Sequence, residues 1–163
     1  MKNFRVKHNM HLSTGILFNH ESPKKDKSYV LRKISSSVAK IKTGLQNKML
    51  LGDIKSKRDW GHAKDFVRAM WLICQQKKPD DYVIGTGKLH SVEDFVKLAF
   101  KQAKLEYRKY LIIDKKLIRK KDSKPKKADI SKIKDKLKWR PLISFKKMAQ
   151  EMVSNDLKIL NKR

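Results

Sequence analysis

The stretch GILFNHESPKK, residues 15–25, decides how the rest of the chain is interpreted. Its apolar start predicts a strand, which we expect to run from Leu12 to Phe18 and to be mostly buried. The strand ends in the polar run NHESP, residues 19–23. Its side chains can accept or donate hydrogen bonds, two of them can titrate, and the proline then fixes a bend. Residues that only form a turn, such as Gly, Pro, Asn or Ser, would end a strand without titratable groups. The pattern therefore indicates a functional site at the end of a strand.

Strands and helices alternate along the rest of the chain. Further strands are expected at 48–52, 82–87 and 110–113. Helices are expected after a cap at Ser28, at 62–76, after the capping box SVED at 91–94, at about 129–138 and at 144–160. Residues 53–61 are expected to form a loop. This order predicts an α/β fold with some parallel strands, in which sites lie beyond the carboxyl ends of the strands.

Apolar residues at helical spacing predict which side of each helix is buried. In the first helix they are Leu31, Ile34, Val38, Ile41 and Leu45, with Gly44 as the C-cap. In the second they are Phe66, Val67, Met70, Trp71 and Cys74. In the helix at 91 they are Val92, Val96, Ala99 and Phe100, and in the last helix Phe145, Met148, Met152 and Leu157. Cys74, which has no nearby His in the sequence, is interpreted as a packed core thiol rather than a nucleophile.

The composition describes one modest domain, or a piece of a larger one, with enough apolar residues to fold. The chain has 163 residues, 39% of them hydrophobic, and a formal net charge of +26. Most basic residues are lysines spread along the expected polar faces of helices, and only 115–127 is a dense cluster, with eight basic residues among thirteen. Nonspecific polyanion binding fits this charge, but the arrangement of Arg, Asn, Gln or aromatic residues that reads bases is lacking.

Several other classes of protein are disfavoured by the sequence. One Cys and five scattered His cannot build a structural zinc site. No apolar run approaches the roughly 18 residues of a membrane span, and residues 1–10 lack the apolar stretch of a signal peptide. We therefore expect a cytoplasmic protein. The segment GTGKLH, residues 85–90, has half of a phosphate loop, but His90 stands where the third glycine belongs, so a structural turn is the preferred interpretation.

Four segments together resemble GDP-mannose 4,6-dehydratase, a family of the extended short-chain dehydrogenase/reductase group. They are GILFNHESP (15–23), SKRDWGHAKDFVRAMW (56–71), PDDYVIGTGKLHSVEDFVKLAF (79–100) and ADISKIKDKLKWRP (128–141). The resemblance covers nearly the whole chain but only the C-terminal half or so of the family's length. It implies an incomplete Rossmann-like parallel sheet together with the small C-terminal substrate-binding domain, residues 1–163 forming a single fragment.

The resemblance also implies a cofactor, a substrate and residues that bind them. The family oxidises GDP-mannose at C4 with NADP, eliminates water across C5 and C6 and returns the hydride. By similarity, His20 lies against the nicotinamide end of NADP. Lys25 stands where the family usually has an NADP-contacting Arg. A lysine keeps the positive charge but cannot form the two parallel hydrogen bonds of a guanidinium group. Asn19 would hydrogen-bond near the substrate.

Two arginines resemble the family's diphosphate clamp. Arg58 in KRDWGHA and Arg119 in LIRKKD would each present parallel donors to the oxygens of the pyrophosphate. Asp122 stands where the family has a Glu that contacts the nucleotide ribose, and its side chain is shorter. The basic cluster around Arg119 would also concentrate a doubly charged nucleotide sugar. Trp60 and Trp139 are interpreted as core aromatics.

The groups that run the family's acid/base chemistry should precede residue 12, and they are not found there. The Gly-rich cofactor loop, the Tyr-x-x-x-Lys pair and the nearby Thr and Glu are expected on a preceding part of the fold. We therefore expect no catalytic residue in this chain and no activity when it is alone. A separately encoded N-terminal half is an expected partner, and the family's homo-oligomer is another. A basic module that binds polyanions stays open as the alternative function, and a degraded gene without a product function also fits.

Overall fold

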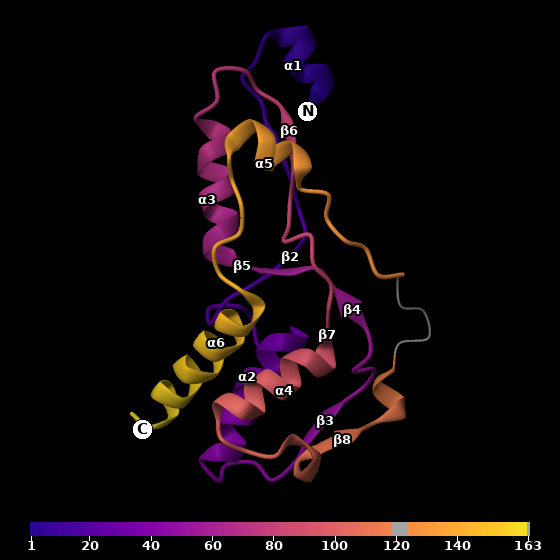
Figure 1. The fold of residues 1–163 in the computed structure, drawn as a ribbon, viewed down its shortest axis with the longest axis vertical. Helices are drawn as coiled ribbons and strands as arrows, with labels where there is room; N and C mark the ends of the chain where they lie inside the picture. The colour runs from indigo at the N-terminus through magenta and orange to yellow at the C-terminus, as the bar shows by residue number, and fades with distance from the viewer. Residues whose placement is uncertain (119–123, 163) are drawn as a thin grey trace.

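The computed structural model describes residues 1–118 and 124–162 as an elongated α/β molecule (Figure 1). Its helices are α1 (Lys2–His8), α2 (Val30–Lys42), α3 (Ala63–Cys74), α4 (Val92–Gln102), α5 (Ser131–Leu137) and α6 (Phe145–Leu160), with short 3-10 helices at Tyr107–Lys109 and Lys115–Leu117. Its strands are β1 (Thr14–Leu17), β2 (Asn19–Glu21), β3 (Met49–Leu51), β4 (Lys57–Arg58), β5 (Trp60–His62), β6 (Asp81–Ile84), β7 (His90–Ser91) and β8 (Leu111–Ile113). The expected alternation of strands and helices is confirmed.

The strands of the described residues pair two by two. Three pairs are parallel: β1 with β6, β2 with β5 and β3 with β8. The fourth pair, β4 with β7, is antiparallel and sets Arg58 opposite His90. Because β2 follows β1 after a single residue, the end of the β1–β6 sheet leads directly into the β2–β5 pair.

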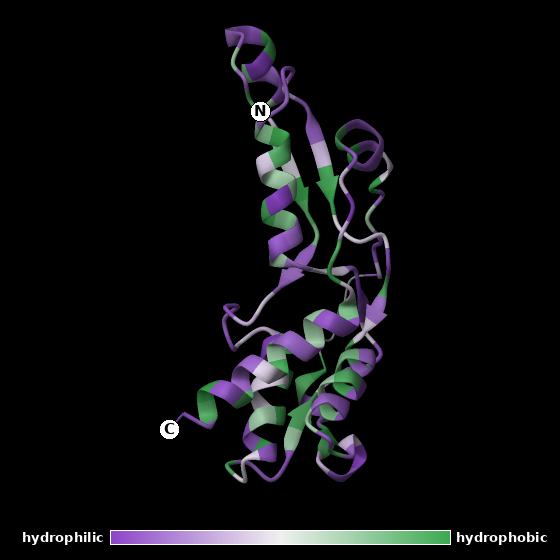
Figure 2. Ribbon diagram, turned by 60° about the vertical axis from the view of Figure 1, so that its left-hand side comes forward, coloured by the Kyte–Doolittle hydropathy of each residue, from purple (hydrophilic) through white to green (hydrophobic). Residues whose placement is uncertain are grey.

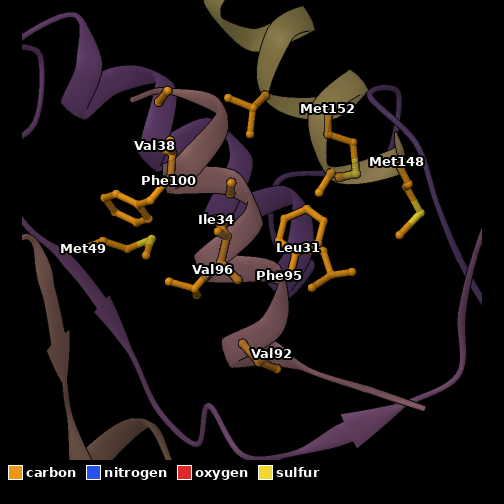
Figure 3. Packing of buried hydrophobic residues seen from close by; sticks show 14 of the residues in the cluster. Leu31, Ile34, Val38, Met49, Val92, Phe95, Val96, Phe100, Met148 and Met152 are labelled. Atoms are coloured by element: carbon orange, nitrogen blue, oxygen red, sulfur yellow. The ribbon is translucent and has the colours of Figure 1, made fainter. Parts of the chain in front are cut away.

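The lower part of the molecule contains a helical core. Helices α2, α4 and α6 pack against one another, and strands β3 and β8 lie beside them (Figure 1). Figure 3 shows Leu31, Ile34 and Val38 of α2 meeting side chains of α4 and α6. The described members of this cluster that are fully buried include Phe95, Val96, Phe100, Met148 and Met152. The predicted apolar faces of α2, α4 and α6 are thereby confirmed.

A smaller core lies in the upper part of the molecule. It joins Phe66, Ala69 and Ile73 of α3 to Tyr82 and Ile84 of β6 and to Ile133 and Trp139. Trp139 is fully buried and donates its indole N–H to the carbonyl of Asp65 over 3.1 Å. Trp60 is 4% exposed, so both tryptophans are core aromatics as expected.

Local sequence signals placed several helix ends correctly. Ser91 and Asp94 form the reciprocal capping box at the start of α4. Ser144 caps α6 by accepting from the amide of Lys147. Gly44 follows the end of α2 with a φ of 75°, which a glycine adopts without strain.

Other local expectations are wrong. Ser28 does not cap α2, which begins after Tyr29, and its hydroxyl instead donates to the carboxylate of Asp26. Leu45 lies beyond the helix and is 66% exposed. The expected loop at 53–61 contains β4 and the start of β5, because two- and three-residue strands form only when distant segments pair with them.

The expected burial is also wrong for β1 and for four of the five apolar residues predicted on the buried side of α3. Ile16 and Leu17 of β1 are 52% and 39% exposed. On α3, Phe66 is buried, but Val67, Met70, Trp71 and Cys74 are exposed. The apolar side chains of α3 extend around more of the helix than the other described residues cover. Cys74 is therefore not a packed core thiol. Among the described residues, no helix has both the length and the apolar character that a membrane crossing requires.

Candidate functional site

The first three residues of the NHESP segment form β2, and strand pleating sends successive side chains to alternate faces. Asn19 is exposed and His20 is half-buried, whereas Glu21 is only 4% exposed. The strand is held by parallel pairing with β5, which sets Asn19 opposite Trp60 and Glu21 opposite His62. The predicted site therefore lies where the sequence stretches around residues 19 and 58 meet in space.

A cavity of about 220 Å³ lies beside the start of β2. It is lined by Leu17, Phe18, Asn19, Arg58, Asp59, Lys124 and Lys126. Arg58 is held in place by hydrogen bonds from its Nη1 to the hydroxyl of Ser56, over 3.0 Å, and to the carbonyl of Lys57, over 2.8 Å. The cavity thus combines an amide, a guanidinium and two ammonium groups, a set of donors suited to an anion.

Asp59, which also lines the cavity, is a structural hub that the sequence analysis missed. Its carboxylate is 1% exposed and accepts four hydrogen bonds. Two come from the amide and hydroxyl of Thr86, over 2.8 and 2.5 Å, one from the amide of Gly87, over 2.8 Å, and one from the amide of Ala128, over 3.1 Å. The negative charge that faces the cavity is therefore already satisfied by internal donors.

The same contacts decide between the two interpretations of the GTG segment. The amides of Thr86 and Gly87, which a phosphate loop would present to a ligand, donate to Asp59 instead. A Cβ on Gly85 would lie 2.4 Å from the Cβ of Ala128, so this glycine permits a close approach of two backbone segments. The structural turn is confirmed.

The two expected cofactor residues contact each other. The ammonium of Lys25 donates to the carbonyl of His20 over 3.3 Å and lies 4.1 Å from the centre of the Tyr29 ring. The Nδ1 of His20 lies 3.0 Å from the carbonyl oxygen of Phe18. Because a carbonyl oxygen can only accept, Nδ1 carries a proton, and in the neutral ring Nε2 is then an acceptor. The His20 ring also packs on Phe66, with 4.9 Å between ring centres.

Glu21 is a second feature that the sequence analysis did not assign. Burial raises its pKa from 4.5 to about 7, and the nearby charge of Lys25 opposes this shift. Its Oε2 atom is buried without a hydrogen-bond partner among the described residues. A carboxyl group that titrates near neutrality therefore lies directly after His20. The only signal in the sequence was a Glu at the end of a strand, which does not reveal burial.

A larger cavity, of about 640 Å³, lies elsewhere between β7, α4 and the segment before α6. Its walls include Trp60, His90 and Phe145, and the last two rings stack in parallel with 4.0 Å between their centres. None of the expected site residues lines it. We place the candidate site at the smaller cavity, because cationic side chains from two separate segments meet the amide of Asn19 there.

The comparison with known families identifies the chain. A family model described as GDP-mannose 4,6 dehydratase matches residues 1–152. The chain belongs to this family. It is 43% identical over 157 residues to GDP-mannose 4,6 dehydratase 1 of Arabidopsis thaliana. The aligned region covers 96% of this chain and 44% of that protein. It is 39% identical over 175 residues to the Homo sapiens GDP-mannose 4,6 dehydratase, covering 97% and 47%.

Solved structures of the same fold match the chain over a similar share. RMD from Pseudomonas aeruginosa, complexed with NADPH, superposes with a TM-score of 0.88 at 20% identity and covers 96% of this chain but 52% of its own. UDP-glucose 4-epimerase from Thermotoga maritima superposes with a TM-score of 0.80 at 22% identity, covering 98% and 50%. The expected α/β fold of the extended short-chain dehydrogenase/reductase group is confirmed. This GDP-mannose 4,6-dehydratase family member spans about half the length of the relatives it matches.

Two of the expected substrate residues of this family member, Arg119 and Asp122, lie outside the described residues. Asn19 and Arg58 line one cavity, and Lys124 and Lys126 there belong to the same basic cluster as Arg119. His20 and Lys25 contact each other on β2 and the loop that follows, and neither lines this cavity. Among the described residues no three His, Cys, Asp or Glu side chains are arranged to hold a metal ion.

Proposed function

We propose that this chain is the nucleotide-sugar-binding part of a GDP-mannose 4,6-dehydratase, a lyase that converts GDP-mannose to GDP-4-dehydro-6-deoxy-mannose with NADP. The observation that supports this most directly is the cavity in which Asn19 and Arg58 meet Lys124 and Lys126. Family membership supplies the substrate class, and the cavity supplies a place for its charged part.

The charges around the cavity suit a diphosphate. A guanidinium offers paired donors to phosphate oxygens, while the two lysines act as point charges without a fixed geometry. Because Asp59 is fully hydrogen-bonded inside the protein, its carboxylate is not an unpaired repulsive charge facing the ligand. The net charge of +26 would also raise the local concentration of a dianionic nucleotide sugar. In this proposal Arg119 supplies a second guanidinium and Asp122 contacts the ribose.

NADP would be held on the side of β2 that carries His20. Lys25 offers a positive charge there, and the carbonyl of His20 fixes the position of that ammonium. The acceptor Nε2 of His20 would face a donor such as the nicotinamide carboxamide. When bound, NADP would take a hydride from the sugar and return it. The residues of this chain would orient the sugar and the cofactor, and the acid/base groups would come from the remaining half of the fold, so the chain alone would have no dehydratase activity.

Calorimetric titration with GDP and GDP-mannose tests the binding site. We expect both ligands to bind the wild-type chain and Arg58→Ala to weaken binding at least tenfold, since a bidentate charged contact is lost. Arg58→Lys should recover part of the affinity, because it restores the charge without the fork. Arg140→Ala is the matched control: it removes one exposed guanidinium that does not line the cavity.

The alternative, a basic module for polyanions, predicts a different pattern. Such a module would bind duplex DNA with a steep dependence on salt, and GDP would have no effect on the chain. In that case Arg58→Ala and Arg140→Ala would weaken DNA binding equally. Binding of GDP-mannose that is insensitive to Arg58→Ala would place the ligand elsewhere and contradict the proposed site.

A further inference from the structure

The larger cavity, of about 640 Å³, has no part in the proposed function. Its volume is in the range of about 300 to 1,000 Å³ that is usual for small-molecule pockets. It lies in the middle of the molecule, where the N-terminal ends of α4 and α6 approach β7 and β5 (Figure 1). It shares no lining residue with the smaller cavity of Asn19 and Arg58. A ligand in the larger cavity would therefore occupy a site of its own.

One wall of the larger cavity is aromatic. Phe145 is 9% exposed and stacks on His90, with 4.0 Å between the ring centres and 1° between the ring planes. Trp60 is buried and stacks on Phe145, with 6.1 Å between the ring centres. Because Phe145 covers one face of the His90 ring, the imidazole borders the cavity with its other face or an edge. A further aromatic ring can stack on that face or meet that edge, which are the two arrangements that aromatic pairs prefer.

The His90 ring contributes this aromatic surface without a charge of its own. Burial lowers the pKa of His90, so the imidazole is neutral at pH 7. Positive charge in the cavity must therefore come from other side chains.

Lysines supply that charge. Four charged side chains line the cavity: Lys88, Lys97, Lys146 and Asp94. The Asp94 carboxylate accepts from the amide of Ser91 over 2.8 Å, and Lys97 pairs with Glu93 over 2.8 Å. Lys88 and Lys146 are exposed, and no carboxylate of the described residues forms an ion pair with either. Two ammonium groups are thus available to an anion.

The walls of the cavity are held in place by the fold. The buried carboxylate of Asp65 accepts from the amides of Leu142 and Ile143, over 3.0 and 2.9 Å, and so fixes the segment before α6. The capping box of Ser91 and Asp94 fixes the start of α4. Hydrophobic and hydrophilic residues alternate along both helices (Figure 2), so apolar and charged side chains reach the cavity from the same elements. A preformed pocket needs little ordering when a ligand binds.

We propose that the larger cavity is a second ligand site, which binds a small planar aromatic anion with its ring against His90 and its anionic group at Lys88 and Lys146. The inference is independent of GDP-mannose binding, because it uses none of the residues of the smaller cavity.

Both parts of such a ligand are required by the lining of the cavity. A simple inorganic anion would leave the apolar side chains of Leu98, Leu142 and Ile143 in contact with water. An uncharged aromatic compound would make no use of the two unpaired ammonium groups. A ligand that carries both features satisfies the apolar wall and the lysines at once.

Calorimetric titration of the 163-residue chain in 0.15 M NaCl with naphthyl phosphate tests the proposal. Naphthol and inorganic phosphate are the two matched probes, since each has one half of the ligand. We expect naphthyl phosphate to bind at least tenfold more tightly than either. His90→Leu keeps an apolar side chain but removes the planar ring, and it should weaken binding about fivefold.

Lys146→Glu should weaken the binding of naphthyl phosphate at least tenfold, because it reverses a charge at the cavity. Lys147→Glu is the matched control. It makes the same change of charge in the first turn of α6, at an exposed residue that does not line the cavity, and should have less than a threefold effect. Circular dichroism shows whether each variant folds, and the exposed Lys146 keeps the test valid if His90→Leu does not fold.

Three results would overturn the proposal. The first is equal affinity for naphthyl phosphate and one of its two halves. The second is an equal loss for Lys146→Glu and Lys147→Glu, which would mean that only the general charge attracts the ligand. The third is competition with GDP or a loss with Arg58→Ala, which would place the ligand in the smaller cavity. Failure of GDP itself to bind would contradict the proposed function and leave this inference standing.

Discussion

Glu21 is the residue in the NHESP segment whose environment changes its chemistry most. Burial raises its pKa from 4.5 to about 7, so the folded protein binds a proton between these values that the unfolded chain has released. The contribution of Glu21 to stability is therefore greatest below pH 4.5, falls as the pH rises to about 7, and is constant above that. The loss is about 3 kcal/mol, since one pKa unit corresponds to 1.36 kcal/mol.

Glu21→Gln removes this titration and should flatten one part of the pH profile. We expect the variant to match the wild type at pH 4.5 and to exceed it by up to about 3 kcal/mol at pH 8 in urea unfolding. Burial lowers the pKa of His62, which acts in the opposite direction, but His62 is present in both proteins and cancels in the difference. Parallel profiles for the two proteins would mean that the pKa of Glu21 is the same in the folded and the unfolded chain, contrary to this expectation.

Asp59 is a residue whose loss should affect both stability and the site. Asp59→Asn replaces one carboxylate oxygen by an amide that donates towards the amides of Gly87 and Ala128. Because several buried donors lose a charged acceptor, we expect a loss of about 2 to 4 kcal/mol. The control Thr86→Val removes one of the four contacts to Asp59, together with the longer contacts of the same hydroxyl to the backbone of Lys88, and should cost about 1 kcal/mol. Equal costs for the two variants in urea unfolding would contradict the role of Asp59 as a hub.

At the scale of elements, a buried ion pair joins α2 to α6. The guanidinium of Arg32 contacts the carboxylate of Asp156, and both side chains are nearly inaccessible. The same guanidinium donates to the hydroxyl of Ser35 and to the carbonyl of Pro23, each over 2.9 Å, so it also fixes the loop that follows the NHESP strand. The pairing was not visible in the sequence because its partners are 124 residues apart.

Removing one partner of this pair leaves the other charge buried. Arg32→Met is expected to cost about 3 to 5 kcal/mol, whereas Arg32→Met combined with Asp156→Leu should recover most of that loss. A double-mutant cycle by urea unfolding measures the coupling. Lys97→Ala, which breaks an exposed pair with Glu93 at 2.8 Å, serves as a control and should leave the midpoint nearly unchanged. Strict additivity of the Arg32 and Asp156 substitutions would show that the two side chains do not interact.

The elements also show what the sequence could and could not predict. Helix faces, the Ser91 capping box and the Gly44 cap depend on neighbours within a few residues, and they were predicted correctly. Strands β4, β5 and β7 are two or three residues long and exist through pairing with distant segments, so periodicity did not detect them. Burial of Trp71 and Ile16 was expected from an apolar pattern, but burial requires a covering surface that the described residues do not provide. Asp59 was missed for a related reason, since its four donors come from two other segments.

For the whole molecule, the net charge of +26 destabilises the folded state and attracts anionic ligands, and salt weakens both effects. Lysines outnumber their acidic partners, and self-repulsion among like charges destabilises the compact state. Salt screens this repulsion, because the Debye length falls from about 30 Å at 0.01 M to about 8 Å at 0.15 M. The midpoint of thermal unfolding should therefore rise by several degrees when NaCl is increased from 0.01 to 0.3 M.

The same screening should weaken a dianionic ligand. Attraction between the basic cavity and a nucleotide diphosphate falls with salt, so the Kd for GDP should increase while the midpoint of the protein without ligand increases as well. If Arg58 contributes through a directed contact as well as through charge, the affinity ratio between wild type and Arg58→Ala should persist at 0.3 M NaCl, because a hydrogen-bonded ion pair at short range is screened less than a diffuse field. An affinity ratio that falls to one at high salt would show that Arg58 acts only through its positive charge. The guanidinium would then make no directed hydrogen bond to the diphosphate.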